Sequence, residues 1–254
     1  MKNDVITVQS VDRALTIIEI LQKNPRGLGV TELSNRLDVS KSTAHRLLMS
    51  LYSKGFVQQD NQTEKYLLGL KFIEVGQIVS DNLDIRKLAS PYLHQLTEIT
   101  GETAHLAIME QHEIVYIDKL ESTQTIRMFS NIGKRAPIHC TGIGKAIFAF
   151  LPDRKIEEII NETGLHKYTE KTLTTAEEMF SNIQEIRNRG YSIDDEEHEI
   201  GIKCAAAPIF NHNQEVIAGI SVAGPIMRVD EKKLKVMAKE VLRVSSEISK
   251  LLGM

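Results

Sequence analysis

The chain has 254 residues, of which 42% are hydrophobic and 26% are charged, and it carries a formal net charge of −3. This length allows two domains of ordinary size, and the composition is typical of globular proteins. No apolar run approaches the roughly eighteen residues of a transmembrane helix, and the first residues lack a secretory-signal pattern. Cys140 and Cys204 are far apart and outside any CxxC pattern, which argues against a zinc finger or a disulfide scaffold. We therefore expect a cytoplasmic protein.

The charge is distributed unevenly along the chain. Residues 1–80 carry 10 Lys or Arg and 8 Asp or Glu, a net charge of +2, whereas residues 81–254 carry 21 and 26, a net charge of −5. A modest basic excess in the first third of the chain is consistent with a DNA-binding module there.

The first predicted element is a helix that begins after Ser10, a favourable N-cap, with Asp12 in its first turn. Its apolar residues recur with helical spacing, and we expect the following to form its buried stripe: Val11, Ala14, Leu15, Ile18 and Leu21. The segment 24–27, which contains Pro25 and Gly27, ends this helix.

Residues 28–70 predict a helix, a tight turn, a second helix and a two-stranded wing. The short helix spans residues 30–37, with Leu33 and Leu37 facing inward, and the turn spans residues 38–40. Ser40 then caps a helix over residues 41–53, whose expected inward residues are Ala44, Leu47, Leu48 and Leu51. The wing follows as a strand from Phe56, a turn at residues 60–62 and a return strand from Lys65.

The outer face of the 41–53 helix carries hydroxyl, imidazole and guanidinium groups, which can meet base edges and phosphates in the major groove. The expected DNA contacts are Ser40, Lys41, Ser42, Thr43, His45 and Arg46, with Lys65 on the wing. The alternative is a small helical domain whose polar face is only solvated. The wing, the helix cap and the local basic excess together favour DNA binding.

Residues 71–100 have a helical pattern. We interpret residues 71–85 as a linker helix that joins an N-terminal domain of residues 1–70 to a second domain of residues 86–254. A palindromic DNA site would require a dimer, and linker helices often carry dimer contacts, so we expect a homodimer or a tetramer.

The remainder predicts an α+β domain. Strands at 103–110 and 113–120 should form a hairpin, and further strands are expected at 125–129, 191–195, 203–210 and 216–223. Helices are expected at 142–151 and 176–189, followed by a long final helix capped by Asp230, which should pack against the sheet. Antiparallel hairpins with helices beside them give an α+β fold.

Two segments of this domain could carry chemistry. Gly142 and Ile143 lie at a predicted helix start, where free backbone amides can bind an anion, a carboxylate rather than a nucleotide because the spacing is not that of a Walker A loop. The alternative is a tightly packed glycine turn. Cys204 is either a buried apolar residue, a weak donor in a pocket, or a nucleophile that would need a base such as His139 or His198. The histidines show no metal-ligand spacing, so we expect no metal and no cofactor.

Three separated motifs, in this order, resemble those of the IclR-type transcriptional regulators of bacteria. They occupy residues 39–48, 133–146 and 199–209, and the resemblance spans nearly the whole chain. It implies a winged helix-turn-helix domain joined to an effector-binding domain with a GAF-like, profilin-like sheet. It also implies effector contacts at the amides of Gly142 and Ile143, at Asp194, Cys204 and Ser221, and at the apolar residues Met128 and Ile202. A second serine present in some members falls on Ala223 here, which reduces the hydrogen-bonding set.

The resemblance implies a regulator and not an enzyme. We expect a repressor of a catabolic operon that binds duplex DNA at a palindromic operator and responds to a small carboxylate, either an organic acid or a sugar acid. One alternative is a thiol-dependent hydrolase domain fused to a DNA reader, with Cys204 as its nucleophile. Another is a protein-interaction sensor that binds no small ligand.

Overall fold

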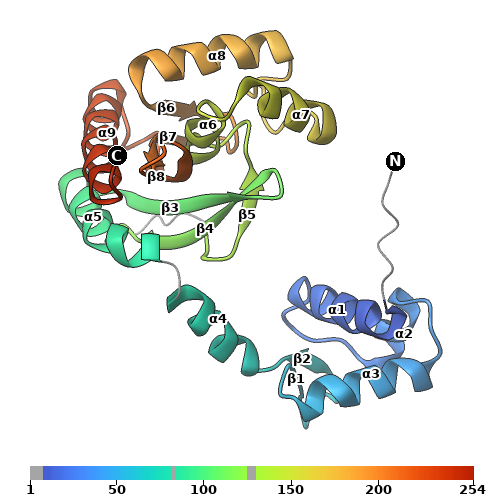
Figure 1. Ribbon diagram of the computed structural model, residues 1–254. Helices are drawn as coiled ribbons and strands as arrows, with labels where there is room; N and C mark the ends of the chain where they lie inside the picture. The colour runs from blue at the N-terminus through green and yellow to red at the C-terminus, as the bar shows by residue number, and fades with distance from the viewer. Residues whose placement is uncertain (1–7, 82–83, 125–129) are drawn as a thin grey trace. The chain divides into compact units, whose positions relative to one another are not determined.

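The computed structural model describes residues 8–81, 84–124 and 130–254. The chain divides into two compact units, Met1–Asn82 and Leu83–Met254, and the division falls inside the predicted 71–85 segment (Figure 1). Among the described helices, none has the length and apolar character needed to cross a membrane.

The first unit is a winged helix-turn-helix, as predicted. Its elements are α1 (Gln9–Gln22), α2 (Val30–Arg36), α3 (Lys41–Ser53), β1 (Val57–Gln59), β2 (Tyr66–Leu68) and α4 (Lys71–Asp81). The two short strands pair antiparallel and form the wing, and an isolated bridge joins Leu28 to Tyr66. This bridge ties the segment before α2 to the return strand of the wing.

The buried face of α1 differs from the prediction. The helix begins ahead of Ser10, so this residue is not its N-cap. Ile17 and Leu21 are buried, whereas Val11 and Leu15 are 56% and 55% exposed. Apolar residues lie on more than one face of this helix, so periodicity alone does not select the buried one. The packing of α1 against α3 and β2 makes that selection.

The third helix follows the prediction closely. The Ser40 hydroxyl accepts a hydrogen bond from the backbone N–H of Thr43 at 3.2 Å, which caps α3. Ala44 and Leu48 are fully buried, and they anchor the helix in the core of this unit. The opposite face of α3 is therefore presented to solvent.

The second unit is an α+β domain built on one antiparallel sheet, as predicted. Its helices are α5 (Asp84–Thr100), α6 (Gly142–Phe148), α7 (Asp153–Thr163), α8 (Ala176–Arg189) and α9 (Glu231–Leu251). Its strands are β3 (Thr103–Glu110), β4 (Glu113–Leu120), β5 (Arg135–Pro137), β6 (Ser192–Asp195), β7 (Ile202–Phe210) and β8 (Val216–Pro225). They lie in the order β5-β4-β3-β8-β7-β6.

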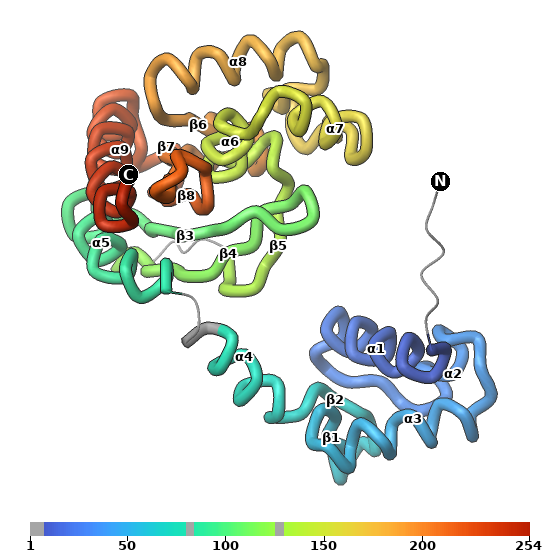
Figure 2. The backbone as a smooth tube through the Cα atoms, in the orientation of Figure 1, coloured from blue at the N-terminus to red at the C-terminus, as the bar shows by residue number. Residues whose placement is uncertain are grey.

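Helices cover both faces of this sheet. The paired helices α5 and α9 lie on one face, and α6 lies on the other, with α7 and α8 beside it (Figures 1 and 2). Successive strand residues point to opposite faces, so Ala205 and Ala207 of β7 join the core under α9, whereas Cys204 and Ala206 join the core under α6. The apolar series of α9 is therefore used for packing against the sheet, as expected.

The predicted hairpin is also confirmed. β3 and β4 pair antiparallel through a two-residue loop, Gln111 and His112, and both loop residues have a positive φ. Tight hairpin loops need this left-handed conformation because it matches the twist of the strands. Two elements, β5 and α7, were not predicted. The strand predicted at residues 125–129 lies outside the described part of the chain.

Candidate functional site

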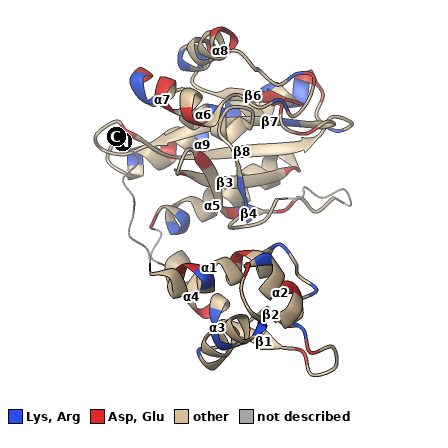
Figure 3. Ribbon diagram, turned by 90° about the vertical axis from the view of Figure 1, so that its right-hand side faces the viewer, with Lys and Arg blue, Asp and Glu red and all other residues tan. Residues whose placement is uncertain are grey.

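The amino-terminal half of α3 brings the expected DNA contacts together. Lys41, Ser42, His45 and Arg46 are exposed, and Thr43 is half-buried, with its hydroxyl 2.9 Å from that of Ser40. Figure 3 marks the lysine and arginine positions of α3 in blue. Short polar and cationic side chains on a helix anchored by its other face can enter the major groove.

The wing carries the remaining expected contact. Lys65 is half-buried and directly precedes β2. At the wing tip, the Asp60 carboxylate accepts hydrogen bonds from the backbone N–H groups of Gln62 and Thr63, at 3.0 and 2.7 Å. This Asx turn orders the loop that joins the two strands.

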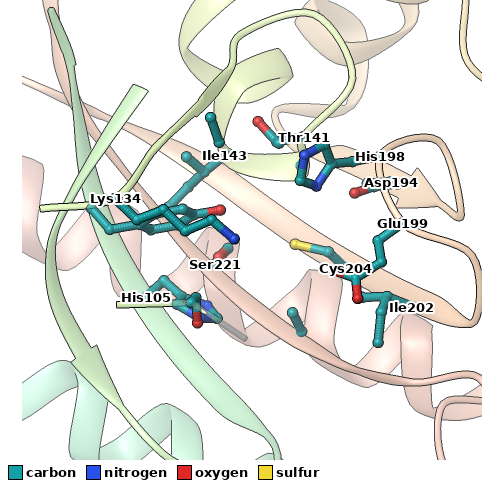
Figure 4. Close-up of a pocket in the computed structure, with 15 residues that line it drawn as sticks. His105, Lys134, Thr141, Ile143, Asp194, His198, Glu199, Ile202, Cys204 and Ser221 are labelled. Carbon is teal, nitrogen blue, oxygen red and sulfur yellow. The ribbon is translucent and has the colours of Figure 1, made fainter. Parts of the chain in front are cut away.

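The second unit contains a small cavity of about 50 Å³ on the α6 side of the sheet. Figure 4 shows side chains from several strands and from the start of α6 pointing into it. Six residues implied by the family resemblance line this cavity: Gly142, Ile143, Asp194, Ile202, Cys204 and Ser221. The seventh, Met128, lies outside the described residues.

Strand register explains why residues so distant in sequence meet here. Asp194 of β6 lies opposite Cys204 of β7, and Cys204 lies opposite Ala223 of β8. Ser221 of β8 lies opposite His105 of β3. Directly opposed residues project from the same face of a sheet, so these side chains form two adjacent rows in the floor of the cavity.

The start of α6 closes one side of the cavity. Thr141 caps the helix by accepting a hydrogen bond from the N–H of Gly144 at 3.1 Å. Among the described residues, no acceptor is found for the backbone N–H of Gly142 or of Ile143. A Cβ atom at Gly142 would lie 2.5 Å from the Cys204 sulfur. The segment is therefore both a tightly packed turn and a source of two available amide donors.

Asp194 contributes a buried carboxyl group. One of its oxygens accepts a hydrogen bond from the backbone N–H of Glu197 at 2.8 Å. Burial raises the pKa of Asp194 to about 7, because the ionised form loses hydration. Near neutral pH this carboxyl group can therefore either donate a hydrogen bond to a ligand or accept one.

Sequence reasoning did not assign two histidines of the cavity to the site. The Nε2 atom of His105 lies 2.7 Å from the hydroxyl of Ser130, and burial lowers the pKa of His105 to about 3, with a smaller effect from Lys119. Burial also lowers the pKa of His198. Both imidazoles are therefore neutral hydrogen-bonding groups at neutral pH. The period-two alternation of β3 could have identified His105, because it shares a strand face with Ala107.

The lining residues that were missed also include Tyr116, Lys134 and Glu199. Tyr116 is an interior residue of β4, whereas Lys134 and Glu199 lie outside the regular elements. Neither loop residue belongs to a helix or strand that was predicted from the sequence.

The thiol of Cys204 lacks the surroundings of a nucleophile. Burial raises its pKa, so the group remains a thiol near neutral pH. Its sulfur lies 3.7 Å from the carbonyl oxygen of Ala205. Within the described residues, no hydrogen bond joins Cys204 to His139 or His198, and the Nε2 atom of His139 is instead 3.0 Å from the carbonyl oxygen of His166. These residues do not form a nucleophile–base pair.

Both units of the chain match domains of one known protein family. Residues 10–61 match the IclR helix-turn-helix domain, and residues 77–250 match the C-terminal domain of bacterial IclR transcriptional regulators. The transcriptional repressor IclR of Escherichia coli is 33% identical over 248 residues, which cover 97% of this chain and 90% of that protein. The crystal structure of the Thermotoga maritima IclR is 35% identical, with a TM-score of 0.82 over 96% of this chain and 99% of that chain.

A more distant solved structure shares the fold. It is an IclR homologue from Microbacterium hydrocarbonoxydans in complex with 4-hydroxybenzoate, 20% identical, with a TM-score of 0.80 over 95% of this chain and 99% of that chain.

The winged helix-turn-helix and its matched relatives define a DNA-binding transcriptional regulator. More specifically, the chain belongs to the IclR family of bacterial transcriptional regulators. Its relatives are regulators, so the chain is not an enzyme, and the thiol-hydrolase alternative is wrong.

Proposed function

We propose that the protein represses a catabolic operon and that a small organic or sugar acid in the cavity changes its affinity for DNA. The observation that carries the proposal is the convergence of Asp194, Cys204, Ser221 and two amides without a described acceptor on one cavity. Buried polar groups that face a cavity provide the few oriented contacts by which small ligands are recognised. The bound 4-hydroxybenzoate of the Microbacterium homologue supports an acid as the ligand.

The DNA contacts would come from residues 40–46 of α3, with Lys65 on the wing. The exposure of Lys41, His45 and Arg46 supports this assignment. Residues 71–85 would act as the linker between a DNA-binding domain of residues 1–70 and an effector domain of residues 86–254. The protein would act in the cytoplasm, where bacterial DNA lies.

Two copies would bind a palindromic operator, as a dimer or as a tetramer made of two dimers. Exposed apolar side chains on the first unit support this association. On α4, Ile73, Ile78 and Val79 are 69%, 63% and 58% exposed. Exposed apolar side chains of this kind favour a protein partner over water, and a second copy supplies the two-fold symmetry that a palindrome requires.

The test is a paired measurement of ligand binding and operator binding. Thermal shifts with a panel of keto, hydroxy and sugar acids would identify an effector, and fluorescence anisotropy would then measure operator affinity with and without it. We expect the effector to change operator affinity in the wild type. We expect Ser221→Ala to reduce that response while operator affinity without effector is unchanged, because Ser221 faces the cavity in the other unit. A full response in this variant would contradict the assignment of the pocket, and a ligand with equal affinity for both states would shift nothing.

A further inference from the structure

The backbone of Lys134 is held beside β4 just ahead of β5. Its carbonyl oxygen accepts a hydrogen bond from the N–H of Tyr116 at 3.1 Å. The preceding residue, Gly133, donates its N–H to the carbonyl oxygen of Tyr116 at 2.8 Å. Because both bonds join the same residue of a central-sheet strand, the Cα atom of Lys134 has a defined position at the cavity.

Neighbouring residues of this segment point in alternate directions. Lys134 and Ala136 line the cavity. Arg135, between them, is exposed and forms ion pairs with Glu110 and Glu113. Figure 4 shows the Lys134 side chain extending into the pocket, with its nitrogen on the side of Ser221 and Cys204. The alternation expected of an extended chain thus sends one of two consecutive cations inward and the other outward.

Lys134 differs from the other described lining residues of the cavity in its positive charge. Among the described lining residues, it is the one lysine or arginine, and the carboxyl groups are those of Asp194 and Glu199. Burial lowers the pKa values of His105 and His198, so neither imidazole supplies a positive charge at neutral pH. The charge of Lys134 also contributes to lowering the pKa of His198, which places the two groups within electrostatic reach.

A carboxylate that enters such a cavity loses hydration and needs a charged partner. A lysine ammonium forms a short, charge-assisted hydrogen bond with a carboxylate. Neutral hydroxyl, thiol and imidazole groups can orient a ligand here, but they do not compensate its negative charge.

We infer that Lys134 binds the carboxylate of the effector and makes the pocket prefer acids to their neutral analogues. This inference rests on the proposed function of the pocket. In Figure 4, Lys134 and Asp194 lie on opposite sides of the pocket. A ligand that uses both would carry a carboxylate at one end and a hydroxyl group at the other. Lys134 is thus a specificity-determining residue, and a small hydroxy acid is the ligand class that fits.

The test compares each acid with its primary amide, which has nearly the same shape but no charge. The probes are lactate with lactamide, glycerate with glyceramide, and gluconate with gluconamide, measured by titration calorimetry on the full chain. The variants are Lys134→Gln and the matched control Arg135→Gln, which removes the same charge from the outward-facing neighbour. We expect Lys134→Gln to weaken acid binding by roughly 10- to 100-fold, the range for a hydrogen bond to a charged group. Amide binding should change less than about threefold, Arg135→Gln should bind like the wild type, and Lys134→Arg should retain the acid preference.

The possible failures are distinguishable. If the wild type binds the acids and Lys134→Gln binds them equally well, the role of Lys134 is overturned while the effector pocket stands. If the wild type binds an acid no more tightly than its amide, the role of Lys134 is overturned without any variant. If the wild type binds none of the acids, the acid-binding pocket and the role of Lys134 both fail for this ligand class.

Discussion

Asp194 of β6 and Cys204 of β7 lie directly opposite each other and face the same cavity. The carboxyl and thiol groups are both buried, and neighbouring charge from Asp194 adds to the effect of burial in raising the pKa of Cys204. This pairing places the Asp194 carboxyl group, which titrates near neutral pH, beside the Cys204 thiol, which does not. The ionisation of the cavity floor therefore depends mainly on Asp194.

The pH dependence of stability should report this buried carboxyl group. The pKa of Asp194 is about 7 in the folded protein, against an ordinary value of 3.8. The folded state holds the proton more tightly, so this contribution to stability is present at low pH and is lost as pH rises from about 4 through 7. We expect Asp194→Asn to flatten the profile of unfolding free energy over this range, measured by urea denaturation. Asp12→Asn, at an exposed position, should keep the wild-type slope, and equal slopes in all three proteins would contradict the prediction.

Binding of an acid should depend on the same proton. An ionised Asp194 repels a carboxylate ligand, so we expect acid affinity to fall as pH rises above about 7 in the wild type. Asp194→Asn should bind acids with less dependence on pH between 6 and 8. Titration calorimetry at constant ionic strength measures the acid affinity of the wild type and of the variant at each pH. An unchanged pH profile in the variant would show that another group controls binding.

Arg46→Ala and Lys41→Ala should weaken operator binding. Each exposed cation that contacts a phosphate releases about one counterion, so each variant should lower the slope of log affinity against log salt concentration by about 1. Anisotropy titrations at several salt concentrations give both quantities. Lys239→Ala changes an exposed lysine in the other unit and serves as the control. If both α3 variants bind the operator with the affinity and salt slope of the wild type, this face of α3 does not contact the DNA.

Gly142→Ala should damage the pocket. Its new Cβ atom would lie 2.5 Å from the Cys204 sulfur, so the start of α6 and strand β7 must move apart. We expect a loss of stability of about 1–3 kcal/mol, as for other overpacked sites, together with weaker effector binding. The double variant Gly142→Ala with Cys204→Ala removes the close contact and should recover part of the stability. Thermal and urea unfolding of the wild type, the two single variants and the double variant gives a double-mutant cycle. If the losses of stability of the two single variants add up in the double variant, the close contact is contradicted.

Ile78→Glu should weaken self-association. A charge in the exposed apolar surface of α4 would have to be buried in the proposed contact between copies, at a large cost in desolvation. Sedimentation velocity should show a higher dissociation constant for the dimer. Ile200→Glu places the same substitution at another exposed isoleucine, in the second unit, and should leave association unchanged. The same sedimentation profile for wild type and Ile78→Glu would exclude α4 from the interface.

The sequence alone determined the features that depend on local chemistry. The cap at Ser40, the inward positions Ala44 and Leu48, and the hairpin of β3 and β4 all follow from short-range spacing and are confirmed. The family resemblance also implied six residues that line one cavity. These predictions succeeded because capping and strand alternation act over only a few residues.

Tertiary structure decided the features that depend on which surfaces meet. It selected Ile17 instead of Val11 for the core, because a helix with apolar residues on several faces is oriented only by its packing partners. It also brought His105 and Lys134 to the cavity, one from a central strand and the other from a loop, and neither residue was assigned to the pocket from the sequence. The register of six strands joins residues more than a hundred positions apart, such as His105 and Ser221, and that long-range pairing is what creates the pocket.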